Sequence, residues 1–209
     1  MQKTKKEKEI RSSSTNAQQE RIWVKRAKNG SREAFEQLAN RYYGDIFRMI
    51  YYRTQRRMDA EDLAQDVFLK AYKSLSGLTD EDRFKGWLFR IAVNRVRDFY
   101  RRKKFSHLFR NISNEEVDAH VDTHAQAGSG PLETLIRKQF FQESEMFLSR
   151  LSTMEKDVFV LRFINQLRIN EIAIALRKGE STIKTHLYRA LSKFKRDRAF
   201  QDFLKGERI

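Results

Sequence analysis

Apolar residues recur at three- and four-residue steps through most of the chain, a spacing that predicts amphipathic helices. The first helix is predicted to begin at Ser31, a suitable N-cap, and its apolar face comprises Phe35, Leu38, Tyr42, Ile46, Met49 and Ile50. A second helix is predicted from about Asp59 to Leu75, with a core face of Ala60, Leu63, Ala64, Val67, Phe68 and Ala71. Ser76 and Gly77 break the pattern, and a third helix is predicted from about Phe84 to Lys104. No strand-like alternation separates these helices, so they predict one antiparallel helical unit.

The periodicity is lost from about Phe105 to Gly130, and the charge changes sign there. From Phe105 to Arg137 there are five acidic residues against two basic ones, and Gly128-Ser129-Gly130-Pro131 is the strongest breaker cluster in the chain. Helical spacing then returns through Leu132, Leu135, Ile136, Phe140, Phe147, Leu151, Val158, Leu161 and Ile164. We therefore predict an all-α protein of two small helical domains joined by a flexible linker. Its parts are a basic tail (1–18), a first domain (19–104), the linker (105–131) and a second domain (132–209).

The last part of the chain has the spacing of a helix-turn-helix motif. A short helix around Ile172–Leu176 is followed by four residues, Arg177 to Glu180, and then by a longer helix from about Ser181 to Phe200. The apolar stripe of the longer helix comprises Ile183, Leu187, Ala190, Leu191 and Phe194. A helix in this position enters the major groove and reads base edges with its N-terminal residues. An ordinary helical hairpin with a solvated basic face would have the same spacing, so the motif alone leaves both alternatives open.

The formal net charge is +15 and the pI is about 10.1, which favours a polyanionic partner. Nucleic acid is the leading candidate, and an anionic membrane surface is the second. The surplus is concentrated in two predicted helices. Arg83 to Lys104 holds nine basic residues and one acidic residue, and Arg177 to Arg198 holds eight basic and two acidic residues. Two separate basic patches predict two contact surfaces.

Aromatic and basic residues alternate at the start of the third predicted helix. At about 100° per residue, its apolar side chains group with Leu88 on one face. The opposite face holds Arg90, Asn94, Arg97, Arg101 and Lys104, and it could follow a phosphate backbone. Phe84 and Trp87 are either stacking platforms for unpaired bases or ordinary core residues, and the sequence leaves both readings open.

The second predicted helix is acidic within a basic chain. Asp59, Asp62 and Asp66 fall on one face, beside Glu61 and Gln65. At these spacings the carboxylates form a flat array along one helix, whereas a metal site needs converging ligands. We therefore interpret the face as a docking surface for a basic protein partner, with metal binding or acid–base catalysis as the weaker alternative.

The composition excludes several kinds of chemistry. The chain has no cysteine, which excludes disulfides, thiolate nucleophiles and cysteine-ligated zinc and fits a reducing cytoplasm. No apolar run is long enough for a membrane helix, and the polar N-terminus predicts no secretory signal. There is no P-loop, dinucleotide fingerprint or zinc-protease motif, and the histidines are scattered at His107, His120, His124 and His186. We expect no enzymatic activity, catalytic residue, cofactor, metal or small-molecule substrate.

Three segments resemble the extracytoplasmic-function (ECF) group of bacterial RNA polymerase sigma factors. They are Ala60 to Phe68 (AEDLAQDVF), Phe84 to Ala92 (FKGWLFRIA) with Asn94 and Asp98, and Leu151 to Phe163 followed by the helix-turn-helix. They occur in the family's order, and the resemblance covers about residues 20–104 and 132–198. The motif departs from the family pattern at three positions. Arg168 replaces the usual Ser or Thr cap, and Arg177 and Lys178 stand where glycine and an apolar residue are usual.

The resemblance implies a role for each surface. The acidic helix would hold the clamp helices of the largest polymerase subunit through Asp59, Glu61, Asp62, Gln65 and Asp66. The third helix and the loop before it would open and read the minus-ten promoter element through Phe84, Lys85, Trp87, Arg90, Asn94, Arg97 and Arg101. The last helix pair would read the minus-thirty-five element as duplex through Arg168, Ser181, Thr182, Lys184, Thr185, Tyr188 and Arg189. The acidic linker would thread toward the active cleft of the polymerase, which would supply all the chemistry.

The expected partners are core RNA polymerase, promoter DNA and an anti-sigma factor, which in this family is often membrane-anchored. The expected location is the cytoplasm. The alternative is a helix-turn-helix repressor or activator that binds duplex DNA without polymerase and uses its N-terminal half for dimerisation or ligand binding. That alternative gives the stripe of Arg90 no role, and binding to core polymerase separates the two.

Overall fold

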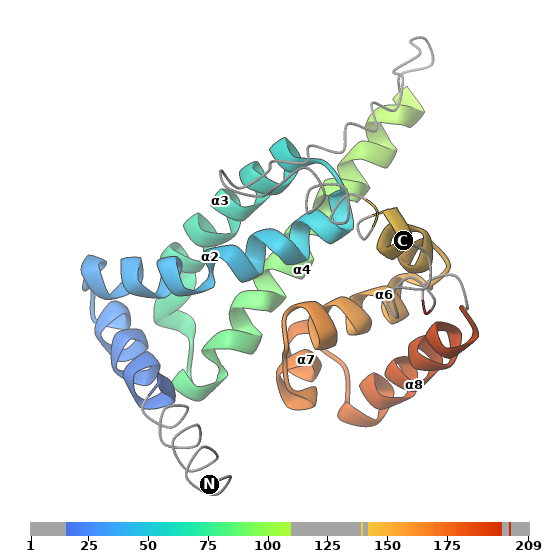
Figure 1. The fold of residues 1–209 in the computed structure, drawn as a ribbon. Helices are drawn as coiled ribbons and strands as arrows, with labels where there is room; N and C mark the ends of the chain where they lie inside the picture. Colours follow the sequence, from blue (N-terminus) through green and yellow to red (C-terminus); the bar gives the residue numbers. More distant parts are fainter. Residues whose placement is uncertain (1–15, 110–138, 140–141, 198–200, 202–209) are drawn as a thin grey trace, which may run out of the picture.

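The computed structural model describes residues 16–109, 139, 142–197 and 201, and the regular elements in these residues are all helical (Figure 1). A helix over residues 16–28 precedes α2 (Arg32–Thr54) and α3 (Arg57–Ser74). Two 3-10 turns, Leu75–Gly77 and Glu81–Arg83, lead to α4 (Phe84–Phe109). The C-terminal part has a helix over residues 142–149, α6 (Thr153–Phe159), the π-helical turn η3 (Val160–Ile164), α7 (Ile169–Leu176) and α8 (Glu180–Arg196). The predicted all-α class is confirmed.

The N-terminal domain is a bundle in which the apolar faces of α2, α3 and α4 meet (Figure 1). Ser31 caps α2 as predicted, because its Oγ accepts a hydrogen bond from the N–H of Ala34 at 3.2 Å. The six apolar residues predicted for α2 are buried, and so are those of α3 except Phe68, which is half-buried. Removal of this apolar surface from water is the main force that holds the three helices together.

The helix over residues 16–28 is a feature that the hydrophobic pattern did not predict. Val24 and Ala27 are buried against the bundle, and the Tyr42 hydroxyl donates a hydrogen bond to a Glu20 carboxylate oxygen at 2.6 Å. Burial and then the Glu20 charge raise the pKa of Tyr42. The predicted tail over residues 1–18 therefore ends too late, since residues 16–18 are helical and residues 1–15 lie outside the described residues.

The C-terminal domain is held by an aromatic cluster and a capping box. Phe147 packs against Phe159 and Phe194 with ring centroids 5.1 and 5.6 Å apart. Ser152 and Glu155 cap α6 reciprocally, because Ser152 Oγ accepts from the Glu155 N–H and the Glu155 carboxylate accepts from the Ser152 N–H at 2.9 Å. The same carboxylate lies 2.6 Å from the Nζ of Lys193 on α8, which lowers the pKa of Glu155 and ties the two helices together.

Several predicted boundaries differ from the structure. Helix α4 continues to Phe109, so the first five residues of the predicted linker are helical, and 110–131 lie outside the described residues. Helix α7 begins at Ile169 rather than near Ile172. Helix α8 ends at Arg196 because Asp197 leaves the helical conformation, whereas helix was predicted to Phe200. The predicted apolar positions 132, 135, 136 and 140 also lie outside the described residues.

The two domains pack against each other through α4 and α7, which lie side by side (Figure 1). Gly86 on α4 faces α7, and a Cβ atom there would lie 3.0 Å from both the Glu171 carbonyl oxygen and the Ile174 Cβ. A second contact is made by Asn165, whose Nδ2 donates to the main-chain oxygen of Asp45 on α2 at 2.8 Å. Glycine at position 86 thus allows an approach that a larger residue would prevent.

Candidate nucleic-acid and protein interfaces

The helix-turn-helix of α7 and α8 forms with an unusual turn. The main-chain N–H of Arg168 donates to the Glu171 carboxylate at 2.6 Å. Glu171 therefore caps the start of α7, although the Arg168 side chain has no acceptor atom with which to cap the helix in return. Arg177 ends α7 in the left-handed region at φ +52°, a conformation that glycine adopts at lower cost. Gly179 is the N-cap of α8, with extended backbone at φ −67° and ψ 151°. The motif therefore keeps its geometry despite the arginine in the turn.

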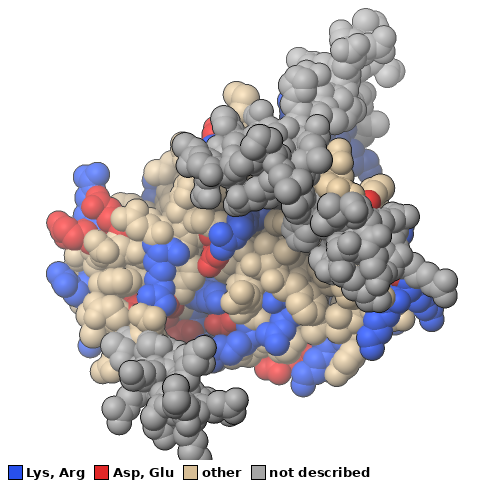
Figure 2. All heavy atoms as spheres, in the orientation of Figure 1, with Lys and Arg blue, Asp and Glu red and all other residues tan. Residues whose placement is uncertain are grey.

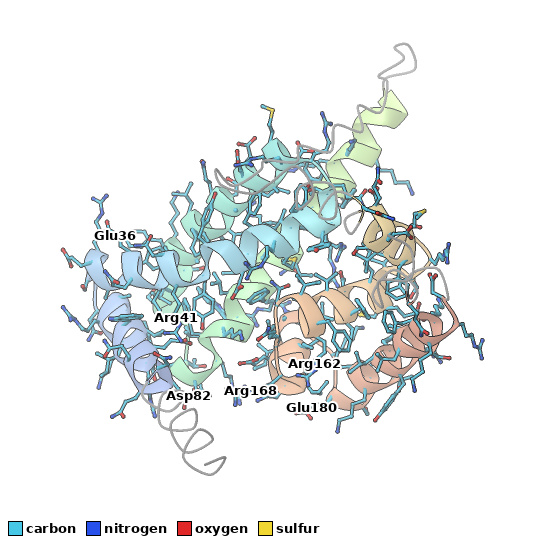
Figure 3. The ribbon with its side chains drawn as sticks, in the orientation of Figure 1. Glu36, Arg41, Asp82, Arg162, Arg168 and Glu180 are labelled. Atoms are coloured by element: carbon cyan, nitrogen blue, oxygen red, sulfur yellow. The ribbon has the colours of Figure 1, made fainter. Side chains whose placement is uncertain are left out.

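The predicted minus-thirty-five residues lie together on the outer face of this motif. Ile183 and Ala190 bury the inner side of α8, and Tyr188 on the outer side is 69% exposed. Thr182 is half-buried, and the other members of the set, Arg168, Ser181, Lys184, Thr185 and Arg189, are exposed. Arg168 and Glu180 mark the starts of α7 and α8 in Figure 3, and Figure 2 shows basic side chains gathered over these helices.

The predicted minus-ten residues on α4 are divided by the fold. Phe84 and Trp87 are 1% and 7% exposed, and their rings pack together with centroids 5.8 Å apart. Of the two readings that the sequence left open, the structure supports core packing for these aromatics, and neither ring is accessible to a base here. Arg90 is half-buried, and burial, followed by the charge of Arg177, lowers its pKa.

The remaining polar residues of the predicted minus-ten set lie on α4, and some of them pair with residues of the C-terminal domain. Asn94, Arg97 and Arg101 are exposed on α4. Lys85 Nζ lies 3.8 Å from a carboxylate oxygen of Glu171, and Arg97 lies 3.4 Å from a carboxylate oxygen of Asp157. Arg101 pairs within its own helix with Asp98 at 3.0 Å. Two of the predicted DNA-binding cations are therefore paired with acids of the C-terminal domain.

The acidic face of α3 is partly engaged in local ion pairs. Asp59 lies 3.8 Å from Arg56, and Glu61 lies 2.7 Å from Arg57. Asp62, Gln65 and Asp66 are exposed. The predicted set therefore presents a carboxylate edge to solvent along one side of the helix.

An apolar groove of about 610 Å³ adjoins this edge, between α2 and α3. Its lining includes Phe35, Tyr43, Gln65, Phe68, Leu69 and Tyr72. Leu69 and Tyr72 are exposed apolar residues that the sequence analysis did not assign to the docking surface. The sequence does contain a sign of their role, since both are large apolar residues outside the predicted core face of the second helix. The structure thus joins an acidic edge to an apolar groove, a combination suited to a protein partner.

Two family profiles match the chain, Sigma-70 region 2 over residues 38–106 and Sigma-70 region 4 over residues 142–194. The RNA polymerase sigma factor YlaC of Bacillus subtilis is 30% identical over 79% of this chain and 92% of its own length. The ECF RNA polymerase sigma factor BldN of Streptomyces coelicolor is 31% identical over 80% of this chain, which spans 61% of BldN. The chain belongs to the ECF sigma factors. It directs transcription initiation by RNA polymerase, and the repressor alternative is not favoured.

Solved structures have the same fold as this sigma factor. CnrH, solved in complex with the cytosolic domain of CnrY, has a TM-score of 0.62 and 25% identity over 85% of this chain and 95% of CnrH. The sigma factor RpoE of Bartonella quintana, solved in complex with the anti-sigma factor NepR, has a TM-score of 0.60 and 23% identity over 83% of this chain and 98% of RpoE. The second likeness concerns the fold alone.

The described part of this sigma factor holds no candidate metal centre. No three histidine, aspartate or glutamate side chains there gather closely enough to hold a metal ion. His186 is half-buried on α8, and the side chains of His107, His120 and His124 lie outside the described residues. Within the same residues, no helix has the length and apolar character needed to cross a membrane.

Proposed function

We propose that this sigma factor reads its promoter with two basic helices, as opened strand at α4 and as duplex at α8. The observation that carries the duplex part is the exposed outer face of α8, where Lys184, Tyr188 and Arg189 project away from the buried side. A helix presented in this way can lie in the major groove and donate to base edges. On α4, Asn94, Arg97 and Arg101 have the spacing to follow one phosphate backbone.

Core RNA polymerase docks on the acidic edge of α3 and the apolar groove beside it. Asp62 and Asp66 attract a basic surface, and the exposed side chains of Leu69 and Tyr72 provide the apolar area that a stable protein interface needs. The chain supplies recognition, and the polymerase supplies the chemistry. This sigma factor therefore acts in the cytoplasm, where the polymerase works.

An anti-sigma factor is the proposed regulator. RpoE has the same fold and was solved in complex with the anti-sigma factor NepR, and CnrH was solved in complex with the cytosolic domain of CnrY. A regulator of this class would compete for surfaces that polymerase or DNA also uses.

Reconstituted transcription tests the proposal. Start sites mapped after overexpression of the chain supply the promoter, and purified chain with core polymerase should then initiate at that promoter. A protein that neither co-elutes with core polymerase nor directs initiation from the mapped sites contradicts the proposal.

A charge reversal at Asp62 tests the docking surface separately. Asp62→Lys reverses a charge on the acidic edge and should weaken binding to core polymerase by at least about tenfold, since like charges would then meet across the interface. Glu145→Lys makes the same change at an exposed position in the C-terminal domain and should leave core binding unchanged. Equal affinities for the two variants, measured by fluorescence titration with core polymerase, would remove Asp62 from the interface.

A further inference from the structure

Three consecutive carboxylates stand immediately before α4, in the loop over residues 75–83, which we call the pre-α4 loop. They are Asp80, Glu81 and Asp82. The resemblance to the family assigns this loop and α4 to the opened minus-ten strand, whose phosphates carry the same sign of charge as a carboxylate. A loop with this charge therefore needs cations of the protein beside it if it is to approach DNA.

Two of these carboxylates pair with the helix over residues 16–28, here called the N-terminal helix. Lys28 Nζ donates to a Glu81 carboxylate oxygen at 2.7 Å, and the two side chains are only 20% and 23% exposed. This hydrogen bond lowers the pKa of Glu81. The Arg21 guanidinium lies 3.7 Å from a carboxylate oxygen of Asp82, which Figure 3 shows beside the N-terminal helix. Because the Arg21 pair is open to water and contributes little, Lys28 makes the principal contact.

Within the pre-α4 loop, the remaining bonds are local. Leu78 and Phe84 are buried and anchor the segment that holds the three acids. Asp80 shapes a single turn between these anchors, since its main-chain oxygen accepts from the Arg83 N–H at 3.1 Å and its carboxylate lies 3.0 Å from the Arg83 guanidinium. The bond from Lys28 joins this turn to another helix, 53 positions earlier in the chain.

The end of the N-terminal helix sets the position of Lys28. The Ser31 N–H donates to the main-chain oxygen of Arg26 at 3.0 Å, and the Gly30 N–H donates to that of Ala27 at 3.1 Å, which is the Schellman pattern of a helix end. Gly30 has φ +94°, a conformation that suits glycine. The turn fixes the direction of the N-terminal helix against α2 and leaves Lys28 in its last turn, beside the pre-α4 loop.

We propose that the N-terminal helix belongs to the minus-ten recognition site and that Lys28 is a positioning residue for the pre-α4 loop. Lys28 offsets the charge of Glu81 and holds the loop in the form that receives the opened strand. It acts through Glu81 and not through a contact of its own with DNA. The inference rests on the proposed function, because it takes the loop and α4 to bind that strand.

A double-mutant cycle on open-complex formation tests the role of Lys28. Lys28→Ala leaves the Glu81 charge without its partner, so open complexes with core polymerase at the mapped promoter should fall at least about tenfold. In a Glu81→Gln background, the same change should alter them by less than about twofold, because the charge that Lys28 offsets is gone. Lys28→Arg keeps a cation and should retain most of the native level. Lys25→Ala removes an exposed cation from the same helix and is the matched control.

An equally large effect of Lys28→Ala in both backgrounds would contradict the proposal, because Lys28 would then act independently of Glu81. Core-polymerase affinity, measured by fluorescence titration, should be the same for Lys28→Ala and Lys25→Ala. A loss of core affinity as large as the loss of open complexes would place the defect in docking or folding and overturn the positioning role. The defect should persist on a template whose minus-ten bases are already unpaired, and its disappearance there would also overturn that role.

Hydrogen exchange of the free chain tests the tie between helix and loop without polymerase. The N–H groups of Asp82 and Arg83 bond to Asp80, at 3.0 and 3.1 Å. Both should exchange at least about fivefold faster in Lys28→Ala than in Lys25→Ala, since the loop opens more often once its tie is lost. Equal exchange would mean that Lys28 does not hold the loop, and the proposal is then wrong. If the native chain fails to open the mapped promoter, the proposed function fails, whereas loop exchange still reports on the contact of Lys28.

Discussion

Helices α4 and α8 are both basic and amphipathic, yet their polar faces meet different surroundings. On α8 the polar side projects into solvent, with Tyr188 69% exposed. On α4 the other domain covers part of the polar side, and Lys85 and Arg97 pair with its carboxylates. The two helices show that a similar charge pattern along the chain gives different accessibility, because packing between domains decides which cations are available to a ligand.

The largest expected difference between the helices concerns their aromatic residues. Trp87→Ala removes a buried ring from the N-terminal core and should lower the free energy of unfolding by about 3–5 kcal/mol. Tyr188→Ala removes an exposed ring from α8 and should change it by less than about 0.5 kcal/mol. Urea unfolding measures both. A Trp87→Ala protein of unchanged stability that fails to open promoters would make Trp87 a base platform instead.

The basic residues of α8 come next in size. Lys184→Ala and Arg189→Ala should each weaken binding of the polymerase complex to the minus-thirty-five duplex by about 1–3 kcal/mol if they contact bases. Lys195→Ala removes the same kind of charge from the far end of α8 and is the control. Footprints that match the parent protein in all three variants would exclude the outer face of α8 from recognition.

The pH dependence of stability should show whether the Glu155 carboxylate stabilises the C-terminal domain or acts only as a surface charge. The hydrogen bond from Lys193 lowers the pKa of Glu155, so the stability contributed by this carboxylate is present above its unfolded pKa near 4.5. That contribution is lost as pH falls through the lower folded pKa. Glu155→Gln should therefore cost about 1 kcal/mol at pH 7, as for a lost helix cap, and much less at pH 3.

The matched control lies at the start of α2. The pKa of Glu33 is also lowered, chiefly by main-chain hydrogen bonding, but its side chain is exposed. Glu33→Gln should leave the urea midpoint nearly unchanged at both pH values. Equal effects of the two variants would show that Glu155 acts only as a surface charge.

The smallest effects are expected at two helix ends, one in each domain. Gln55 ends α2 and Arg177 ends α7, both in the left-handed region with φ of +56° and +52°. Gln55→Gly and Arg177→Gly should each raise the free energy of unfolding by about 0.5–1 kcal/mol, because glycine adopts this conformation without steric cost. Thermal melts measure the gain. A loss of stability at Arg177→Gly would mean that its side chain contributes more than its backbone costs.

The helices and their inner faces could be predicted from the sequence. A helix that buries one side needs apolar residues at every third or fourth position, and Leu38, Ile46 and Ala64 are buried where that spacing put them. The Ser31 cap could also be predicted, because capping is a local property of a few residues. The roles of the site residues in DNA and polymerase binding stay predictions.

The tertiary structure alone decided which of these residues are available. Phe84 and Trp87 were ambiguous in the sequence because an aromatic residue at a helix start suits both a core and a base platform. In the fold Phe84 packs against Tyr42 of α2 and against Trp87, and both rings are buried in the core. The pairing of Arg97 with Asp157 joins residues 60 positions apart, so no local pattern could indicate it. Periodicity therefore fixed the elements and their faces, whereas the contact between the domains, which depends on distances across the fold, determined which basic residues face solvent.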